Sequence, residues 1–148
     1  MASTCHAYRT HITAIVVGLL LGLIGCSAGS EVAIAEQAVS AFRKLTDARE
    51  FAAIYHAASD DLRKSTTEQD LTRILMGINA KLGAAKKSER TTWHVNVQTS
   101  GRIVTLGYKT EFQKATGTEQ FVFRISGDKA LLLSYNVSSN ALLINGSS

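Results

Sequence analysis

The chain has 148 residues, 45% of them hydrophobic, and 16 lysines and arginines stand against 12 aspartates and glutamates. This length suits a single domain with one hydrophobic core. The basic residues are dispersed as singles and pairs, whereas a nucleic-acid-binding patch is typically a dense cluster of them. We therefore expect no nucleic-acid partner, although the isoelectric point calculated from the sequence is about 9.2.

The first 24 residues have the pattern of a secretory signal peptide. Residues 1–11 contain Arg9 and no acidic residue, and residues 12–24 are uncharged and mostly apolar. A positive segment followed by an apolar one of this length is typical of such signals. An uncleaved anchor is an alternative, but a spanning helix needs about 20 apolar residues. Cleavage without lipid attachment, at the small residues 27–30, is a second alternative.

The apolar run ends in Leu23-Ile24-Gly25-Cys26, which resembles the processing signal of bacterial lipoproteins. In that family the chain is cut before the cysteine, which then carries a diacylglyceryl group and usually a third acyl chain such as palmitate. Several chains anchor a protein stably, because each buried methylene contributes about 0.8 kcal/mol. The resemblance implies a signal peptide over 1–25, a lipidated Cys26 and a periplasm-facing position in the cell envelope. It favours the outer membrane over the inner one, because Ser27 and not Asp follows the cysteine.

The two cysteines restrict the chemistry of the folded part. Cys5 leaves with the signal peptide and Cys26 is acylated, so the mature domain has no free thiol. Disulfides, cysteine nucleophiles and cysteine metal sites are then excluded. Removal of the signal peptide takes away only Arg9 among the charged residues, so the mature chain stays mildly basic. We expect residues 26–31 to be the lipidated cysteine and a tether, followed by a single domain over 32–144.

Three helices are predicted from apolar spacings of three and four residues. The first covers 31–45, with Arg43 and Lys44 on its polar side. Asp47 and Glu50 form a predicted capping box for the second helix. The third begins within Thr66-Thr67-Glu68-Gln69 and ends at Gly83. The predicted buried faces are Val32, Ala35, Val39, Phe42 and Leu45 in the first helix, Phe51, Ile54, Tyr55 and Ala58 in the second, and Leu71, Ile74, Leu75, Ile78 and Leu82 in the third.

From about Thr91 the apolar period changes to two, which predicts four strands. Turns are predicted at Ser100-Gly101, Thr116-Gly117 and Gly127-Asp128, so the strands form an antiparallel meander. Helices that precede such a sheet indicate an α+β domain, with three helices packed on one face of a curved four-stranded sheet. The predicted alternating rows are Trp93, Val95 and Val97; Val104, Leu106, Tyr108, Thr110 and Phe112; Phe121, Phe123 and Ile125; and Leu131, Leu133, Tyr135 and Val137.

This pattern resembles the cystatin-like, nuclear-transport-factor-2-like cone fold. More specifically, residues 36–138 are similar to a family of uncharacterised bacterial envelope proteins, known only as a domain of unknown function. The chain departs from that family where Tyr55 and Leu71 replace a common Trp, and where Leu133-Ser134-Tyr135 replaces an aromatic-Gly-Tyr ending. The resemblance implies fold and envelope location but no activity. The matching stretches are Phe51 to Tyr55, Ala57 to Ser59, Thr67 to Gln69, Lys81 to Gly83, Gly107-Tyr108, Phe112, Glu119 to Phe121 and Tyr135 to Val137.

The catalytic candidates are weak. His56 stands four residues before Asp60, so the two side chains can pair if the helix continues, and enzymes of the cone fold often use a His, Asp or Tyr in the pocket. However, Tyr55 takes the apolar face, and the next residue along points about 100° away, which indicates a helix-flank position for His56. His94 alternates with the apolar residues of its strand and is expected on the polar or concave face, where it can contact a ligand.

The sequence predicts neither a metal site nor a cofactor. Two isolated histidines without clustered carboxylates do not supply the three or four ligands of a zinc site. A glycine-rich phosphate loop is also missing from the mature chain. Five aromatic residues are candidates for the lining of an apolar pocket, although the simpler interpretation is that they fill the core. They are Tyr55, Tyr108, Phe121, Phe123 and Tyr135.

We therefore expect a lipid-anchored, non-catalytic binding or accessory module. Its partner is the membrane through the lipid and, beyond that, another envelope protein, a second copy of the chain or a small apolar ligand. The alternative is a small hydrolase or isomerase that uses His56 or His94 with a carboxylate in the cone pocket. A third possibility, a structural spacer, predicts neither a cavity nor an exposed apolar patch.

Overall fold

The structure is a computed structural model that describes residues 27–99 and 101–143. The signal segment 1–25, the lipidation candidate Cys26, Ser100 of the first predicted turn and residue 144 lie outside the described residues. Five helices and four strands form in the described part. They are α1 (Ser27–Asp47), α2 (Phe51–Ala57), α3 (Asp60–Ser65), α4 (Glu68–Leu82), β1 (Ala85–Gln98), β2 (Gly101–Phe112), β3 (Thr116–Ser126), β4 (Lys129–Ser138) and α5 (Asn140–Leu143).

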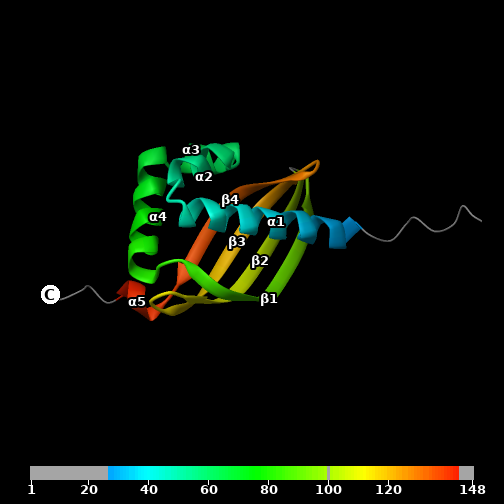
Figure 1. The fold of residues 1–148 in the computed structure, drawn as a ribbon. Coiled ribbons are helices and arrows are strands. Elements are labelled where there is room, and N and C mark those ends of the chain that lie inside the picture. The colour runs from blue at the N-terminus through cyan, green and yellow to red at the C-terminus, as the bar shows by residue number, and fades with distance from the viewer. Residues whose placement is uncertain (1–26, 100, 144–148) are drawn as a thin grey trace, which may run out of the picture.

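The α+β class and the antiparallel meander are confirmed, with strand order β1-β2-β3-β4. The helices are more numerous than the three predicted, because α3 and α5 are separate short helices. Figure 1 shows α1 lying across one face of the sheet, which we call the inner face, while α4 stands at one end of the molecule. Within the described residues, none of these helices combines the length and apolarity that crossing a membrane requires.

Helix α1 begins at Ser27, four residues before the predicted Glu31, and so includes the residues assigned to the tether. The predicted stripe of Val32, Ala35, Val39 and Phe42 is buried. These residues recur on one side of the helix and pack against the inner face of the sheet. Arg43, which the pattern predicted on the polar side, instead turns toward the sheet, because a buried carboxylate lies within its reach.

The predicted capping box at Asp47 is wrong. Asp47 is the last residue of α1, and Glu50 precedes α2 without a side-chain capping hydrogen bond. The backbone N–H of Glu50 donates to the carbonyl of Leu45 at 2.8 Å, and Arg49, with a φ of 61°, donates to Thr46 at 3.1 Å. This is a Schellman ending, in which the left-handed position is usually a glycine. An arginine there concealed the end of α1 from the sequence pattern.

The second predicted helix does not continue past Ala57. Ala58 and Ser59 are extended, and the Ser59 hydroxyl accepts a hydrogen bond from the Leu62 backbone N–H at 3.2 Å, which starts α3. The backbone N–H of Ser59 donates to the carbonyl of Leu132 on β4 at 3.0 Å. A partner distant in the sequence therefore holds the break in place.

The third predicted helix corresponds to α4. Its N-cap is Thr67, whose hydroxyl accepts a hydrogen bond from the Asp70 backbone N–H at 3.1 Å, and it ends before Gly83 as predicted. Leu75 and Leu82 are buried, but Ile74 is 56% exposed. Helix α4 packs against α2 and leaves the margin of its apolar stripe in solvent.

Strand β1 starts at Ala85, six residues before the predicted Thr91. Its pairing with β2 shifts between Ala85 and Lys87 and again between Arg90 and Thr92. Each irregularity places an extra residue in the strand, which interrupts the two-residue period that marks a strand in the sequence. The alternation in the sequence therefore did not reveal the first part of β1, before Thr91.

Strand β4 contains a third irregularity, and it changes which residues face the core. Phe121 pairs with Tyr135, but Phe123 pairs with Leu132, so Leu133 is the extra residue. Leu132 is therefore the buried leucine of this strand. The predicted row of Leu131, Leu133, Tyr135 and Val137 is wrong at its first two positions, because a bulge reverses the alternation beyond it.

Candidate functional site

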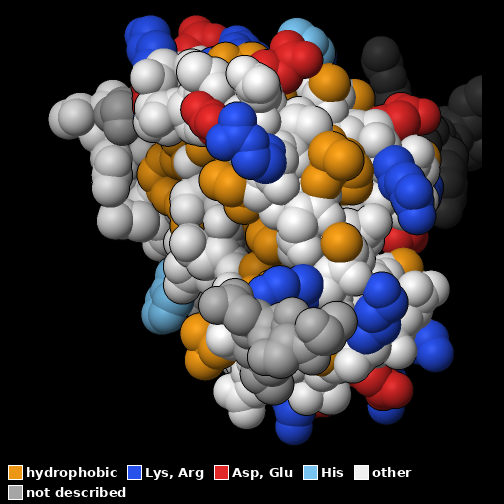
Figure 2. All heavy atoms as spheres, turned by 90° about the vertical axis from the view of Figure 1, so that its left-hand side faces the viewer, with side chains coloured by type: hydrophobic (Ala, Val, Ile, Leu, Met, Phe, Trp, Pro, Cys, Tyr) orange, Lys and Arg blue, Asp and Glu red, His pale blue; other side chains and the backbone are white. Residues whose placement is uncertain are grey.

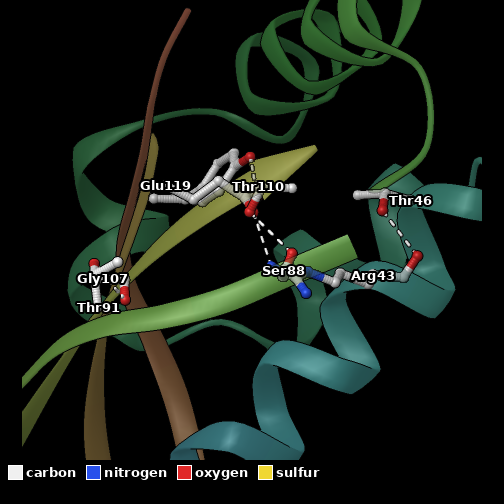
Figure 3. Close-up of polar contacts among 8 residues, drawn as sticks. Arg43, Thr46, Ser88, Thr91, Gly107, Thr110 and Glu119 are labelled. Atoms are coloured by element: carbon white, nitrogen blue, oxygen red, sulfur yellow. Dashed lines mark hydrogen bonds and ion pairs between the residues drawn. The ribbon is translucent and has the colours of Figure 1, made fainter. Parts of the chain in front are cut away.

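A buried carboxylate organises the polar interior. Glu119 on β3 is only 4% exposed. Its carboxylate accepts hydrogen bonds from the Thr110 hydroxyl at 2.5 Å and the Tyr135 hydroxyl at 2.9 Å, and it pairs with the Arg43 guanidinium at 2.8 Å. The Ser88 hydroxyl lies 2.9 Å from that of Thr110. We call these five residues the Glu119 cluster; Figure 3 shows Arg43 reaching it from α1 and Ser88 from β1.

The cluster compensates the cost of burying a charge. A carboxylate taken out of water needs a counter-charge and hydrogen bonds, and here Arg43, Thr110 and Tyr135 supply both. The Arg43 guanidinium also lies 5.1 Å from the ring centre of Tyr108, within cation–π range. Burial raises the pKa of both tyrosines, and the negative charge of Glu119 raises the pKa of Tyr135 further. The Tyr135 hydroxyl therefore stays protonated and donates to Glu119.

The space between α1 and the sheet is filled by aromatic side chains. The Phe121 ring centre lies 5.2 Å from Phe42, 4.8 Å from Tyr135 and 5.9 Å from Tyr108, and Phe123 stacks at 6.1 Å. A cavity of about 30 Å³ remains beside Arg43, Glu119 and Tyr135. That volume is of the order occupied by one water molecule. Tyr108, Phe121, Phe123 and Tyr135, four of the pocket-lining candidates, thus pack against one another.

The fifth candidate, Tyr55, lies elsewhere. It is half-buried on α2, and its hydroxyl donates to the carbonyl of Arg63 on α3 at 3.2 Å. Its ring contacts the His56 ring with centres 5.7 Å apart. Tyr55 therefore links two short helices.

His56 and Asp60 do not pair, because the helix breaks between them. The His56 side chain is 66% exposed, and its Nε2 lies 3.1 Å from the carboxylate of Glu68 on α4. Asp60 is bound by Arg63 within α3. The His56–Glu68 contact is a solvent-exposed link between α2 and α4, and the Asp60–Arg63 pair lies within α3. Neither contact includes a residue of the Glu119 cluster.

His94 is exposed on β1. It pairs with Thr105, whereas its neighbours Trp93 and Val95 pair with buried residues of β2, so alternation directs His94 away from α1. Among the residues that the structure describes, three or more histidine, cysteine or acidic side chains are nowhere grouped as a metal site would need.

An open groove of about 540 Å³ lies at the α4 end, and we call it the α4 groove. Met76 is 53% exposed there. Asp47 and Arg49, at the end of α1, form no ion pair with another described residue. Figure 2 views this side of the molecule, where hydrophobic side chains lie exposed among basic ones. The groove is lined by Asp47, Arg49, Phe51, Met76, Asn79, Ala80, Gly83, Ala84, Gln113 and Lys114.

A protein-family model described as "Protein of unknown function (DUF4019)" matches residues 38–134, well over half of the chain. The chain belongs to this family. No curated protein matches it. The matched DUF4019 segment runs from the second half of α1 to Ser134 on β4, and it contains Arg43, Ser88, Thr110 and Glu119. It also contains every residue that lines the α4 groove.

The sequence contains one signal for the Glu119 cluster, although Glu119 was not among the residues predicted to form a site. Glu119 stands two and four residues before Phe121 and Phe123, so strand alternation alone directs it to the inner face. An acidic residue in such a row indicates a buried charge with a partner. The partner itself had no local signal, because Arg43 precedes Glu119 by 76 residues.

Proposed function

We propose that this DUF4019 protein is a lipid-anchored module of the bacterial cell envelope that binds a partner protein through the α4 groove and catalyses no reaction. The observation that carries the proposal is the groove itself. It is open, and its lining combines the exposed apolar side chain of Met76 with charged residues from the end of α1 and from the β2–β3 turn. Protein–protein interfaces typically combine apolar surface with charged and polar residues.

The lipid anchor supports the envelope location. Leu23-Ile24-Gly25-Cys26 directly precedes Ser27, the first residue of α1. Several acyl chains on Cys26 are sufficient to hold the domain at a membrane without a spanning helix. Ser27 after the cysteine favours the periplasmic side of the outer membrane over the inner membrane.

The hydrolase or isomerase alternative has less support. It needs a histidine beside a carboxylate in an interior pocket, and both His56 and His94 are exposed. The cavity beside Arg43, Glu119 and Tyr135, at about 30 Å³, is far below the several hundred Å³ of a typical substrate site. An open hollow of about 350 Å³ is also lined by Tyr108 and Glu119, but it has no histidine in its lining. A small apolar ligand would need similar enclosure. A protein partner, either another envelope protein or a second copy, suits an open groove better.

The anchor can be tested by mass spectrometry of the protein extracted from the membrane fraction. We expect a mature chain that begins at Cys26 and carries acyl groups on that residue. A Cys26→Ser variant should remain unprocessed and unacylated. An intact N-terminus, or an unmodified Cys26, would contradict the anchor.

The groove can be tested by photo-crosslinking in living cells, with the photoreactive amino acid at Met76 and, as a control, at the exposed His94 on the other face of the sheet. We expect one discrete adduct from position 76 that position 94 does not give. The Arg49→Glu substitution should reduce the yield of this adduct, because it reverses a charge in the lining of the groove. The Lys109→Glu substitution, at an exposed position on β2, should leave the yield unchanged. Equal adducts from positions 76 and 94 would contradict the proposal. An adduct of twice the chain mass would identify a second copy as the partner.

A further inference from the structure

Strand β1 carries three apolar residues on the inner face, Trp93, Val95 and Val97, which we call the apolar row. Trp93 is 50% exposed and Val97 is 70% exposed, while Val95 is half-buried against the core. β1 is an edge strand, since only β2 pairs with it. The row is therefore an apolar surface at the margin of the sheet.

The apolar row lies beside the beginning of α1. Val97 pairs with Arg102 across the β1–β2 ladder, and the Arg102 guanidinium forms an ion pair with Glu31 near the start of α1. Figure 1 shows the N-terminal end of α1 and the far end of β1 on the same side of the molecule, whereas β1 begins beside α4 on the opposite side. Cys26 is the residue before α1, so its lipid would be attached on the side of the apolar row.

The margin around the row has almost no charge. Residues 91–99, Thr-Thr-Trp-His-Val-Asn-Val-Gln-Thr, contain no Asp, Glu, Lys or Arg. Exposed edge strands usually carry such charges, which prevent unwanted pairing. Glu31, an acidic group at the start of α1, is 5% exposed and neutralised by Arg102. An uncharged surface with a tryptophan suits the interface between lipid headgroups and acyl chains.

We propose that the apolar row contacts the lipid surface of the membrane to which Cys26 is anchored. This inference rests on the proposed lipid anchor. The acyl chains hold the start of α1 at the membrane, and Trp93 and Val97 add a second, non-covalent contact. Together they orient the domain, with β1 toward the lipid and the α4 groove away from it.

Trp93 is the only tryptophan of the chain, so its fluorescence reports directly on the row. The experiment uses the mature, acylated protein reconstituted into vesicles of phosphatidylethanolamine and phosphatidylglycerol. We expect the Trp93 emission to lie at a shorter wavelength than in the same chain made without the signal peptide and without acyl chains. That reference protein is measured in buffer without vesicles or detergent. Lipids brominated near the headgroup should quench it, more strongly than lipids brominated deep in the acyl chain. An unshifted, unquenched emission from protein that floats with the vesicles would overturn the inference.

Two matched variants separate the row from the anchor. Val97→Asp places a charge at a 70% exposed site, so the fold tolerates it, and we expect it to remove most of the quenching. Ile74→Asp places the same charge at an exposed apolar site on α4 and should leave the quenching unchanged. Equal quenching in both variants would overturn the proposal. A Trp93 shift that depends on protein concentration in the absence of vesicles would also overturn it, in favour of pairing with a second copy along β1.

The mass of the same reconstituted sample distinguishes the two proposals. An unacylated Cys26 contradicts the anchor and the proposed function with it. An acylated Cys26 with an unquenched Trp93 contradicts only the contact of the apolar row with lipid.

Discussion

At the scale of single residues, Glu119 has the strictest requirements in the domain. Its carboxylate is buried beneath α1 and is satisfied by side chains from α1, β2 and β4. Such a group stabilises the fold only while every partner is present, because an unpaired buried charge is costly. Its role follows from the tertiary structure, since none of its three partners is its neighbour in the sequence.

Removal of the carboxylate by Glu119→Ala should destabilise the protein by about 3–5 kcal/mol, because Arg43 loses its buried counter-charge. Tyr135→Phe removes one hydrogen bond to a charged group and should cost less, about 1.5–3 kcal/mol. Urea unfolding followed by circular dichroism gives both values. A loss below about 1 kcal/mol for Glu119→Ala would contradict the importance of the cluster.

The buried tyrosines predict a loss of stability in alkaline solution. Burial raises the pKa of Tyr108 and Tyr135 in the folded state above the ordinary value of about 10. The neutral form is thus favoured by folding, so this stabilisation is complete below about pH 10 and is lost as the pH rises toward the folded pKa. The free energy of unfolding, measured by urea titration at increasing pH, should fall above about pH 10. The free energy of unfolding of the Tyr135→Phe variant should fall less steeply with pH. A wild-type free energy of unfolding that stays constant above about pH 10 would contradict the prediction.

At the scale of elements, the end of α4 depends on one glycine. Gly83 has a φ of 74° and a ψ of −172°, and an added Cβ would lie 2.8 Å from the Gln113 side chain. That backbone region is open essentially only to glycine, and forcing another residue into it costs about 1–3 kcal/mol. The turn joins α4 to β1 beside the α4 groove, so its geometry also shapes that surface.

Gly83→Ala should therefore destabilise the domain by about 1–3 kcal/mol. Gly77→Ala is the matched control, because Gly77 lies inside α4 and an added Cβ there meets nothing within 4 Å. Helix propensity predicts that this control stabilises by about 0.5–1 kcal/mol. The midpoint temperature of thermal unfolding should be lower than wild type for Gly83→Ala and higher for Gly77→Ala. A shift of both variants in the same direction would contradict the strain assigned to Gly83.

The junctions between helices explain which elements the sequence could predict. The end of α4 was visible because glycine is the usual residue with a positive φ at a helix end. The end of α1 was hidden because Arg49 is the residue with a positive φ there. The break before α3 was hidden for another reason, since Ser59 is held by the carbonyl of Leu132 on the last strand. A pattern within one helix carries no information about such a partner.

At the scale of the whole molecule, the proposed lipid anchor and the proposed lipid contact of the apolar row would give the domain one orientation at the membrane. The far end of β1 and the start of α1 lie on one side, and α4 with its groove lies on the other (Figure 1). A partner in the periplasm would then reach the groove while the protein remains attached to the membrane. This orientation predicts different access to the two surfaces.

Single cysteines can measure that access, because the chain has only Cys5 and Cys26, and the proposed processing would remove the first and acylate the second. On vesicles, Met76→Cys in the α4 groove should react quickly with a bulky, water-soluble maleimide. Val97→Cys in the apolar row should react more slowly on vesicles than in detergent, whereas the rate of Met76→Cys should stay the same. Equal rates for Val97→Cys in both conditions would contradict the orientation.

The sequence alone determined the α+β class and the four-stranded meander, because apolar periods and turn residues act over a few neighbouring positions. The short helices α3 and α5 were not predicted. The sequence also indicated a lipoprotein signal, which mass spectrometry of the mature protein can test. Only the tertiary structure decided where the polar interior and the exposed surfaces lie. Arg43 meets Glu119, and Trp93 and Val97 stay in solvent, because of the path that α1 takes across the sheet. That path results from packing between segments distant in the sequence, which no local pattern encodes.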